Sequence, residues 1–300
     1  MIEDFKIQWF PGHMTRARRM MEEQIKLVDV VVEMLDARIP LASTNPLLSQ
    51  IIGAKPRIIA VNKVDMAEDV HTEAWLTKFR KAGLLAVKVD CATGHGVKQL
   101  LALVQQAAQP VVDKWAKKGV KNRSVRVMIV GIPNVGKSTL INRLVGRRKV
   151  EAQNRPGVTK GQQWVTIAKG LDLLDTPGVL WPKFDDPKVG FALAVTGAVK
   201  EEVFNRDLAA ELLMEWMLHN RLGMLNKYYG LECTGEEGSV EALEKLAKTR
   251  GWLRAGGVLD LDKTRLTFLR DFRMGKIGKV TIDEVDSGRR KSPLFGDDGI

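Results

Sequence analysis

Short apolar runs alternate with longer, helix-like stretches through the first part of the chain. The runs are rich in Val, Ile and Leu and cover residues 29–35, 57–61, 85–89, 126–130 and 171–174. Expected helices lie at 15–27, 70–81, 97–109 and 138–145. Buried strands that alternate with helices are typical of a mostly parallel sheet flanked by helices. The pattern therefore predicts an α/β domain.

The alternation ends near residue 190. Beyond that point, 204–218, 241–249 and 263–274 have the apolar spacing of helices and no strand pattern is visible. We expect an α/β domain over 1–190 with an N-terminal arm at 1–14, and a smaller all-α domain over 191–286. The tail at 287–300, which mixes Gly, Pro and charged residues, is expected to be disordered. Within the first domain, a Lys- and Arg-rich stretch at 110–126 is interpreted as a helix end followed by a connector.

Composition narrows the class of protein. Apolar residues make up 45% of the 300 residues and charged residues 28%, which excludes collagen-like and wholly disordered chains. No apolar run approaches the length of a membrane span, and the N-terminus has no continuous apolar segment like that of a secretory signal. The two cysteines are far apart and suggest neither a disulfide framework nor a metal motif. We expect a monomer in the cytoplasm with no membrane partner.

Charge gives the first indication of a partner. Lys and Arg exceed Asp and Glu by 47 to 36, a net charge of +11. Net charge alone leaves a generic basic protein equally open, but ten basic residues face only three acids in 245–279. Such a cluster is typical of a surface that binds nucleic acid. The candidate RNA contacts are Lys245, Lys248, Arg250, Arg254, Arg270, Arg273, Lys276 and Lys279.

A phosphate-binding loop follows the apolar run at 126–130. Gly131 and Gly136 are followed by Lys137, Ser138 and Thr139, which fits the G-x-x-x-x-G-K-S/T pattern between a strand and a helix. Backbone N–H groups of such a loop, here including 134–136, surround phosphates, and the lysine adds a point charge. The serine hydroxyl can bind Mg²⁺.

Two further motifs indicate which base is bound. Asn62, Lys63, Val64 and Asp65 follow a predicted strand and resemble the guanine-reading N-K-x-D motif, whose Asp accepts hydrogen bonds from the guanine N1–H and 2-amino groups. Cys91 and Ala92 follow the next strand and resemble the small-residue loop whose backbone N–H contacts the guanine carbonyl oxygen. The residues therefore predict GTP and GDP as ligands, and they argue against ATP.

A last pair of motifs completes the expected Mg²⁺ site. Asp175 and Gly178 fit D-x-x-G, whose Asp reaches Mg²⁺ through water and whose Gly N–H contacts the γ-phosphate. Thr159, in a Gly- and Pro-containing segment suited to a mobile loop, is the candidate switch threonine.

The order of these motifs is unusual. The base-reading motifs at 62 and 91 precede the phosphate loop at 131 and the Mg²⁺ motif at 175, whereas most GTP-binding proteins have the phosphate loop first. Each internal spacing is conventional, so the order predicts a circular permutation. The D-x-x-G segment at 175–178 then leads directly into the C-terminal helices. A change in this segment on hydrolysis would therefore couple the nucleotide state to the basic domain.

The residue that usually orients the attacking water is missing. Ras-like proteins have Gln after the D-x-x-G glycine, but Val179 occupies that position here. The sequence therefore predicts slow hydrolysis unless another group substitutes, and His13, on a Pro-Gly turn, is the candidate. A surface histidine at a helix start is the alternative interpretation. Asn134 is a candidate for holding K⁺, as in potassium-stimulated GTPases, or it makes only a loop hydrogen bond.

Taken together, these motifs resemble the ribosome biogenesis GTPase A family of circularly permuted GTPases, also called YlqF. The likeness covers roughly residues 7–285 and includes 9–14, 36–40, 62–65, 131–139, 155–159, 175–178 and 180–182. The resemblance implies that the partner is the precursor of the bacterial large ribosomal subunit, through ribosomal RNA and proteins, and that the C-terminal domain contacts the RNA. It also implies that His13 replaces the missing Gln and that the particle stimulates hydrolysis.

Alternative functions remain open at this level. The leading hypothesis is a GTP-hydrolysing assembly factor that binds the particle with GTP and leaves after hydrolysis. A GTP-dependent RNA-binding scaffold with little hydrolysis is the main alternative, and Val179 favours it. An ATP-driven remodelling enzyme is disfavoured by Asp65, and a peripheral membrane GTPase by the lack of a lipidation motif.

Overall fold

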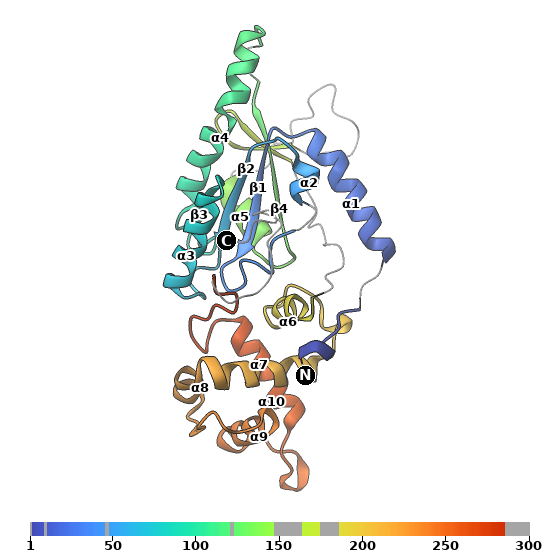
Figure 1. The fold of residues 1–300 in the computed structure, drawn as a ribbon, viewed down its shortest axis with the longest axis vertical. Helices are drawn as coiled ribbons and strands as arrows, with labels where there is room; N and C mark the ends of the chain where they lie inside the picture. The colour runs from blue at the N-terminus through green and yellow to red at the C-terminus, as the bar shows by residue number, and fades with distance from the viewer. Residues whose placement is uncertain are drawn as a thin grey trace. The chain divides into compact units, whose positions relative to one another are not determined.

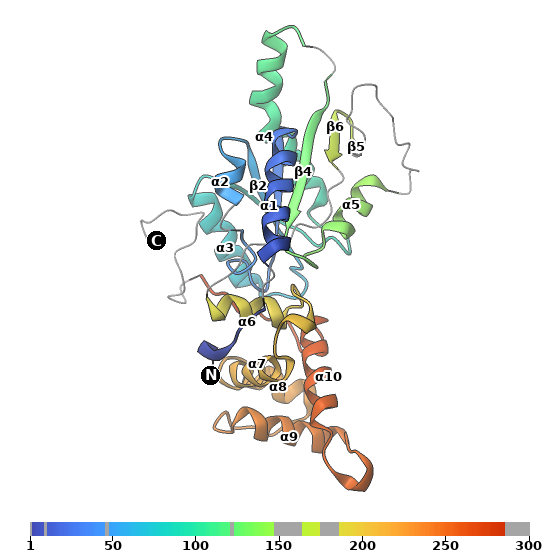
Figure 2. The same ribbon diagram turned by 90° about the vertical axis from the view of Figure 1, so that its right-hand side faces the viewer.

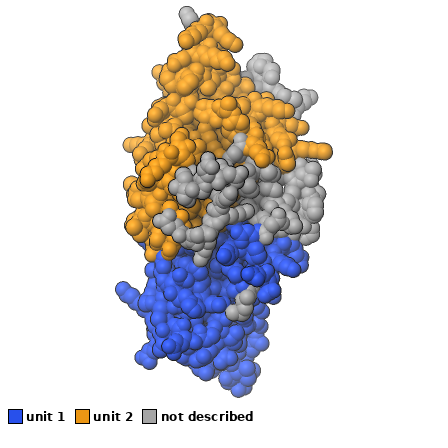
Figure 3. Space-filling model, in the orientation of Figure 1, with its two compact units in different colours: residues 1–9, 184–282 blue, residues 10–183, 283–300 orange. Residues whose placement is uncertain are grey.

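The computed structural model describes residues 2–8, 11–45, 48–120, 123–146, 164–174 and 186–285, and it divides into two compact units. The sheet unit comprises residues 10–183 and 283–300, and the helical unit comprises residues 1–9 and 184–282 (Figure 3). The expected division was 1–190 and 191–286. The expected arm at 1–14 is split between the units. The segment 287–300, expected to be disordered, lies outside the described residues.

A six-stranded sheet organises the sheet unit (Figure 1). Its strands are β1 (Val30–Asp36), β2 (Arg57–Asn62), β3 (Leu85–Lys88), β4 (Val125–Gly131), β5 (Trp164–Ala168) and β6 (Leu171–Leu174), in the order β3-β2-β1-β4-β6-β5. All neighbours are parallel except β5, which pairs antiparallel with β6 at the edge. Five strands were predicted within two residues of their ends, and β5 was not predicted. The mostly parallel α/β fold is therefore confirmed.

Helices cover both faces of this sheet. Helices α3 (Asp69–Lys81) and α4 (Val97–Lys117) lie along one side and α1 (Pro11–Lys26) along the other (Figures 1 and 2). The short α2 (Leu48–Ile52) follows β1, and α5 (Lys137–Val145) follows the phosphate loop. Helix α4 continues through Pro110 and ends eight residues beyond the predicted segment at 97–109.

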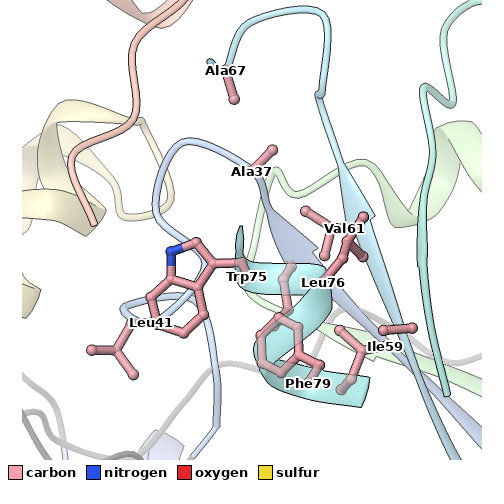
Figure 4. Close-up of a cluster of buried hydrophobic side chains, with 10 residues drawn as sticks. Ala37, Leu41, Ile59, Val61, Ala67, Trp75, Leu76 and Phe79 are labelled. Carbon is pink, nitrogen blue, oxygen red and sulfur yellow. The ribbon is translucent and has the colours of Figure 1, made fainter. Parts of the chain in front are cut away.

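One hydrophobic cluster of the sheet unit receives the returning C-terminal chain. Trp75 and Phe79 of α3 stack with ring centroids 5.6 Å apart, against Ile59 and Val61 of β2 (Figure 4). The Trp75 indole N–H donates to the Asp283 carbonyl at 2.6 Å. The Asp283 carboxylate accepts from the Ala42 N–H at 2.7 Å, and Val285 packs against the same cluster. Residues 283–285, the C-terminal strap, thereby belong to the sheet unit.

The helical unit contains α6 (Pro187–Val195), α7 (Arg206–Asn220), α8 (Leu222–Tyr229), α9 (Ser239–Arg250) and α10 (Leu261–Arg273). Helices α7, α9 and α10 match predicted segments, whereas α6 and α8 were not predicted. The N-terminal residues pack here, because Phe5 contacts the rings of Phe191 and Phe204, and Ile7 forms a β-bridge with Phe204. No helix among the described residues combines the length and apolar character needed to cross a membrane.

Candidate nucleotide-binding site

The candidate motifs meet at the carboxyl edge of the sheet. Because β1, β2, β3 and β4 are parallel, the loops after them lie at the same edge. The N-K-x-D motif follows β2, the small-residue loop follows β3 and the phosphate loop follows β4. The chain reverses its direction of winding between β1 and β4, and open α/β sheets bind ligands in the crevice at such a point. Motifs in swapped order along the chain are thus neighbours in space.

The phosphate loop has a backbone that side chains would obstruct. Gly136, with φ of 107°, precedes α5, and a Cβ there would clash with the Asn62 side chain. A Cβ at Gly131 would lie 2.7 Å from the Met34 carbonyl oxygen. The Lys137 ammonium donates to the carbonyls of Gly131 and Ile132 at 2.8 and 2.7 Å, and burial lowers its pKa to about 8. A loop of this shape, with a partly desolvated cation, fits a phosphate group.

The Asn62 side chain joins the base-reading motif to the phosphate loop. Its amide nitrogen donates to the Val135 carbonyl at 2.7 Å, and its oxygen accepts from the Cys91 N–H at 3.0 Å. Asn62 is only 3% exposed, so both hydrogen bonds are shielded from water. One buried amide therefore fixes three loops relative to one another.

The small-residue loop is organised by two charged residues that lie outside the predicted motifs. Asp90 accepts from the N–H groups of Ala92 and Thr93 at 2.8 and 3.2 Å, in the turn geometry that Asp favours. Arg143 of α5 donates to the Cys91 carbonyl at 2.8 Å and also to the Ala92 carbonyl. Burial opposes ionisation of Asp90, but the hydrogen bonds from Thr93 and Ala92 and the nearby Arg143 hold its pKa below the ordinary value.

The Ala92 N–H already has a local acceptor in the structure. This N–H was predicted to contact the guanine carbonyl, but in the structure it donates to Asp90. The carboxylate of Asp90 is a strong local acceptor, and the prediction for the guanine contact stays a prediction. Cys91 is buried, and burial raises the pKa of its thiol to about 12, so the residue acts here as a small apolar side chain.

A second network holds the lysine of the N-K-x-D motif. The Lys63 ammonium lies 2.9 Å from a carboxylate oxygen of Asp36, which ends β1. Arg38 donates to the same carboxylate from Nε at 3.0 Å and Nη2 at 2.7 Å. Burial alone would raise the pKa of Asp36, but Arg38 and Lys63 hold it well below its ordinary value. In the sequence, Asp36 follows a predicted strand and belongs to the segment 36–40 that resembles the family, but neither feature assigned it this role.

The remaining predicted residues divide into two groups. Val64, Asp65 and Asn134 lie in described loops, and Ser138 and Thr139 lie in the first turn of α5; all except the half-buried Val64 are exposed. Asn134 has a positive φ of 57°. His13 lies in the first turn of α1, where only the backbone is described. Thr159, Asp175, Gly178 and Val179 lie outside the described residues.

The basic residues of the helical unit are less available than their number suggests. Lys245 pairs with Glu237 at 2.8 Å, Arg254 with Asp260 at 3.2 Å and Lys276 with Asp271 at 3.1 Å. Arg273 pairs with Glu201, and Arg250 lies over the Tyr229 ring at 5.3 Å. Lys248, Arg270 and Lys279 are exposed. Much of the local positive charge is therefore compensated within the unit.

Comparison with known proteins identifies the family. Residues 126–216 match a family described as 50S ribosome-binding GTPase. Ribosome biogenesis GTPase A of Bacillus cereus is 44% identical over 277 residues, covering 92% of this chain and 93% of the relative. The chain belongs to the ribosome biogenesis GTPase A family. Two solved YlqF structures agree with this family. One is GDP-bound and the other is the GNP-bound protein from T. maritima. They have TM-scores of 0.65 and 0.64 at 29% identity and cover 89% and 90% of this chain and 100% and 99% of their own.

Membership of the ribosome biogenesis GTPase A family establishes the general activity. The chain is a GTP-hydrolysing enzyme with a phosphate-loop GTPase domain, and it acts in ribosome assembly. The arrangement of β1 to β4 gives this activity a physical basis, because base-reading and phosphate-binding loops converge at one edge.

Proposed function

We propose that the chain is a GTP-driven assembly factor for the large ribosomal subunit, acting as a monomer in the cytoplasm. It binds the precursor particle with GTP and leaves after hydrolysis. The description of the matched family as 50S ribosome-binding supports the choice of subunit. The observation that carries the proposal is the Asn62 amide, which couples the base-reading motif to the phosphate loop and so allows one nucleotide to order both.

Each motif has a role in this proposal. Asp65 accepts hydrogen bonds from guanine, Lys63 covers the base and Ala92 lies beside the guanine carbonyl once Asp90 releases its N–H. The phosphates lie against the loop that includes Asn134, Val135, Gly136 and Thr139, within reach of Lys137, and the Gly178 N–H contacts the γ-phosphate.

Mg²⁺ would be held by Ser138, Thr159 and Asp175. The exposed Ser138 at the start of α5 fits such a ligand. A Mg²⁺ ion held there would supply positive charge that offsets the negative charge of the phosphates. Among the described residues no cluster of His, Cys, Asp and Glu offers another metal site.

Two residues are proposed to shape hydrolysis. His13 orients the attacking water, because Val179 has no hydrogen-bonding group with which to do so. The His13→Ala variant should lower kcat while the GTP dissociation constant stays unchanged. Asn134 helps to hold K⁺ near the phosphates. Equal GTP turnover in K⁺ and Na⁺ buffers would remove that role.

The release mechanism has a direct test. Large-subunit precursors are sedimented with the chain in a non-hydrolysable GTP analogue or in GDP, and the bound fraction is measured. We expect co-sedimentation with the analogue and release with GDP, and equal binding would refute the switch.

Val179 favours a second candidate, a GTP-dependent RNA-binding scaffold with little hydrolysis. GTP turnover measured with and without subunits separates the two. Stimulation by the particle supports the assembly GTPase, and a rate that stays near zero in both supports the scaffold.

A further inference from the structure

The C-terminal part of α4 extends beyond the core that the rest of the helix covers. The buried residues of α4 are Val97, Leu100, Val104 and Ala108, and the nine residues from 109 to 117 include none. At 1.5 Å per residue this extension is about 13 Å long. Both views show it reaching past the end of the neighbouring strands (Figures 1 and 2). The helix therefore continues for more than two turns without a hydrophobic core beneath it.

Contacts with the following connector hold this extension in place. The Arg123 guanidinium lies over the Trp115 ring at 4.1 Å and pairs with Asp29 at 3.3 Å. The Val120 N–H donates to the Trp115 carbonyl at 3.0 Å, which folds the chain back against the helix end. The extension is therefore a fixed platform joined to β1 and β4.

Three exposed lysines occupy this platform. Lys114, Lys117 and Lys118 have the i, i+3, i+4 spacing that places side chains on one side of a helix. Within the described part of the chain, none of them forms an ion pair. The nearest acid in sequence, Asp113, accepts from the Gln109 amide at 2.7 Å. Like charges at this spacing repel one another, so the arrangement favours an anion supplied from outside.

We propose that these lysines, here called the α4 tip (Lys114, Lys117 and Lys118), bind the phosphate backbone of RNA. The inference rests on the proposed function, which supplies an RNA-containing partner. Lysine binds phosphate as a point charge, and a rigid row of cations suits backbone contacts to helical RNA, which is recognised through shape and phosphates. A membrane surface fits less well, because an interfacial helix needs a broad apolar face and the only exposed large apolar residue beside the tip is Val120, among the described residues.

The α4 tip lies at the opposite edge of the sheet from the nucleotide loops. β4 begins at Val125, seven residues after the tip, and ends at Gly131 in the phosphate loop. Six residue steps of about 3.3 Å separate the two ends by about 20 Å. This distance exceeds two Debye lengths at physiological salt, so charges at the tip should leave nucleotide binding unchanged. The chain would then contact RNA through the sheet unit as well as through the helical unit.

The test compares two double charge reversals. The Lys114→Glu/Lys118→Glu variant changes the tip, and Lys81→Glu/Lys227→Glu is the control. The control lysines are also exposed, lie in the last turns of α3 and α8 and form no ion pair in the described part of the chain. A Lys114→Gln/Lys118→Gln variant removes charge without reversing it and guards against misfolding. The probe is a fluorescein-labelled RNA hairpin with a 16-base-pair stem, titrated at several salt concentrations.

We expect the logarithm of the binding constant to depend less steeply on the logarithm of salt in both tip variants, by about two slope units for two lost phosphate contacts. The control variant should keep the wild-type slope, and basal GTP turnover should stay unchanged in all of them. An unchanged slope in the tip variants, an equal loss in the control, or failure of the wild-type chain to bind the hairpin would overturn the proposal. Polyglutamate serves as a second probe. If the tip variants bind polyglutamate more weakly but still bind the hairpin like the wild type, the tip belongs to an acidic protein partner and the proposal is wrong.

The hairpin titration needs no nucleotide, whereas the proposed release mechanism is tested by sedimentation with GTP analogue and GDP. Equal sedimentation in both nucleotides refutes the release mechanism. The proposal for the α4 tip then still rests on the salt dependence of hairpin binding. An unchanged slope refutes the tip and leaves the release mechanism standing.

Discussion

Replacing Asn62 with Ala should weaken both stability and GTP binding. The change removes two buried hydrogen bonds and leaves the Val135 carbonyl and the Cys91 N–H without that partner. Each buried group left unsatisfied costs about 1 to 3 kcal/mol, so the free energy of unfolding should fall by about 2 to 6 kcal/mol. Typical proteins are stable by about 5 to 15 kcal/mol, so the variant should still fold over most of this range.

The effect on GTP affinity follows from the same contacts. In the variant the three loops must be ordered again when nucleotide binds, and every 1.4 kcal/mol spent on this lowers affinity about tenfold. We expect GTP to bind about 10- to 100-fold more weakly. Urea unfolding followed by tryptophan fluorescence gives the stability, and titration of a fluorescent GTP analogue gives the affinity.

Asn226 provides a matched control in the helical unit. Its amide nitrogen donates to the Cys233 carbonyl at 2.8 Å, and its oxygen accepts from the Cys233 N–H at 3.2 Å. Asn226→Ala should therefore lose similar stability and keep wild-type GTP affinity. The reasoning fails if Asn62→Ala unfolds and binds GTP like the wild type, or if Asn226→Ala weakens GTP binding equally.

Three further predictions follow from the site. Asp36→Asn leaves Arg38 and Lys63 without their buried anion and should cost about 3 to 5 kcal/mol in urea unfolding; a loss below 1 kcal/mol, as at an exposed pair, would contradict this. Lys137 has a pKa near 8, so it loses charge as pH rises through 8. Because one proton is coupled to binding, GTP affinity should fall by up to tenfold per pH unit above 8, whereas Lys137→Arg should show a flatter profile; identical profiles in a fluorescence titration would refute the assignment. Arg143→Ala removes the donor to the carbonyls of the small-residue loop, and in competition assays it should reduce the preference for GTP over ATP about tenfold. The control Arg80→Ala removes a hydrogen bond to a carbonyl of β3 and should keep the wild-type preference.

The positions of the nucleotide loops could be predicted from the sequence because particular residue types are required by the local backbone. Gly131 and Gly136 stand where a Cβ would clash, and Asn62 stands where an amide can both donate and accept. Such requirements are visible in the residues whatever their order along the chain. A parallel sheet then brings the ends of its strands to one edge, so the swapped order did not prevent the site from being predicted.

Other features depended on contacts that no local pattern records. Residues Val189–Val195 of α6 are all buried, so the helix has no polar side to reveal its period. β5 is a short edge strand that forms only by pairing with β6, and its Trp164 ring lies under the Arg126 guanidinium of β4. Both contacts come from other strands and leave no pattern within residues 164–168. The hydrogen bond from the Ala92 N–H to Asp90, two residues earlier, likewise left no mark in the local pattern.

The C-terminal strap affects how the sheet unit can be isolated by truncation. Because residues 1–9 belong to the helical unit and 283–285 to the sheet unit, the chain passes between the units three times. Deleting everything after residue 183 would remove the partner of the Trp75 indole along with the helices. A truncated GTPase fragment would thus lose part of its own core, so its turnover would report on damage as well as on separation. A fragment that keeps residues 283–285, joined after residue 183 by a linker, would retain the partner of the Trp75 indole.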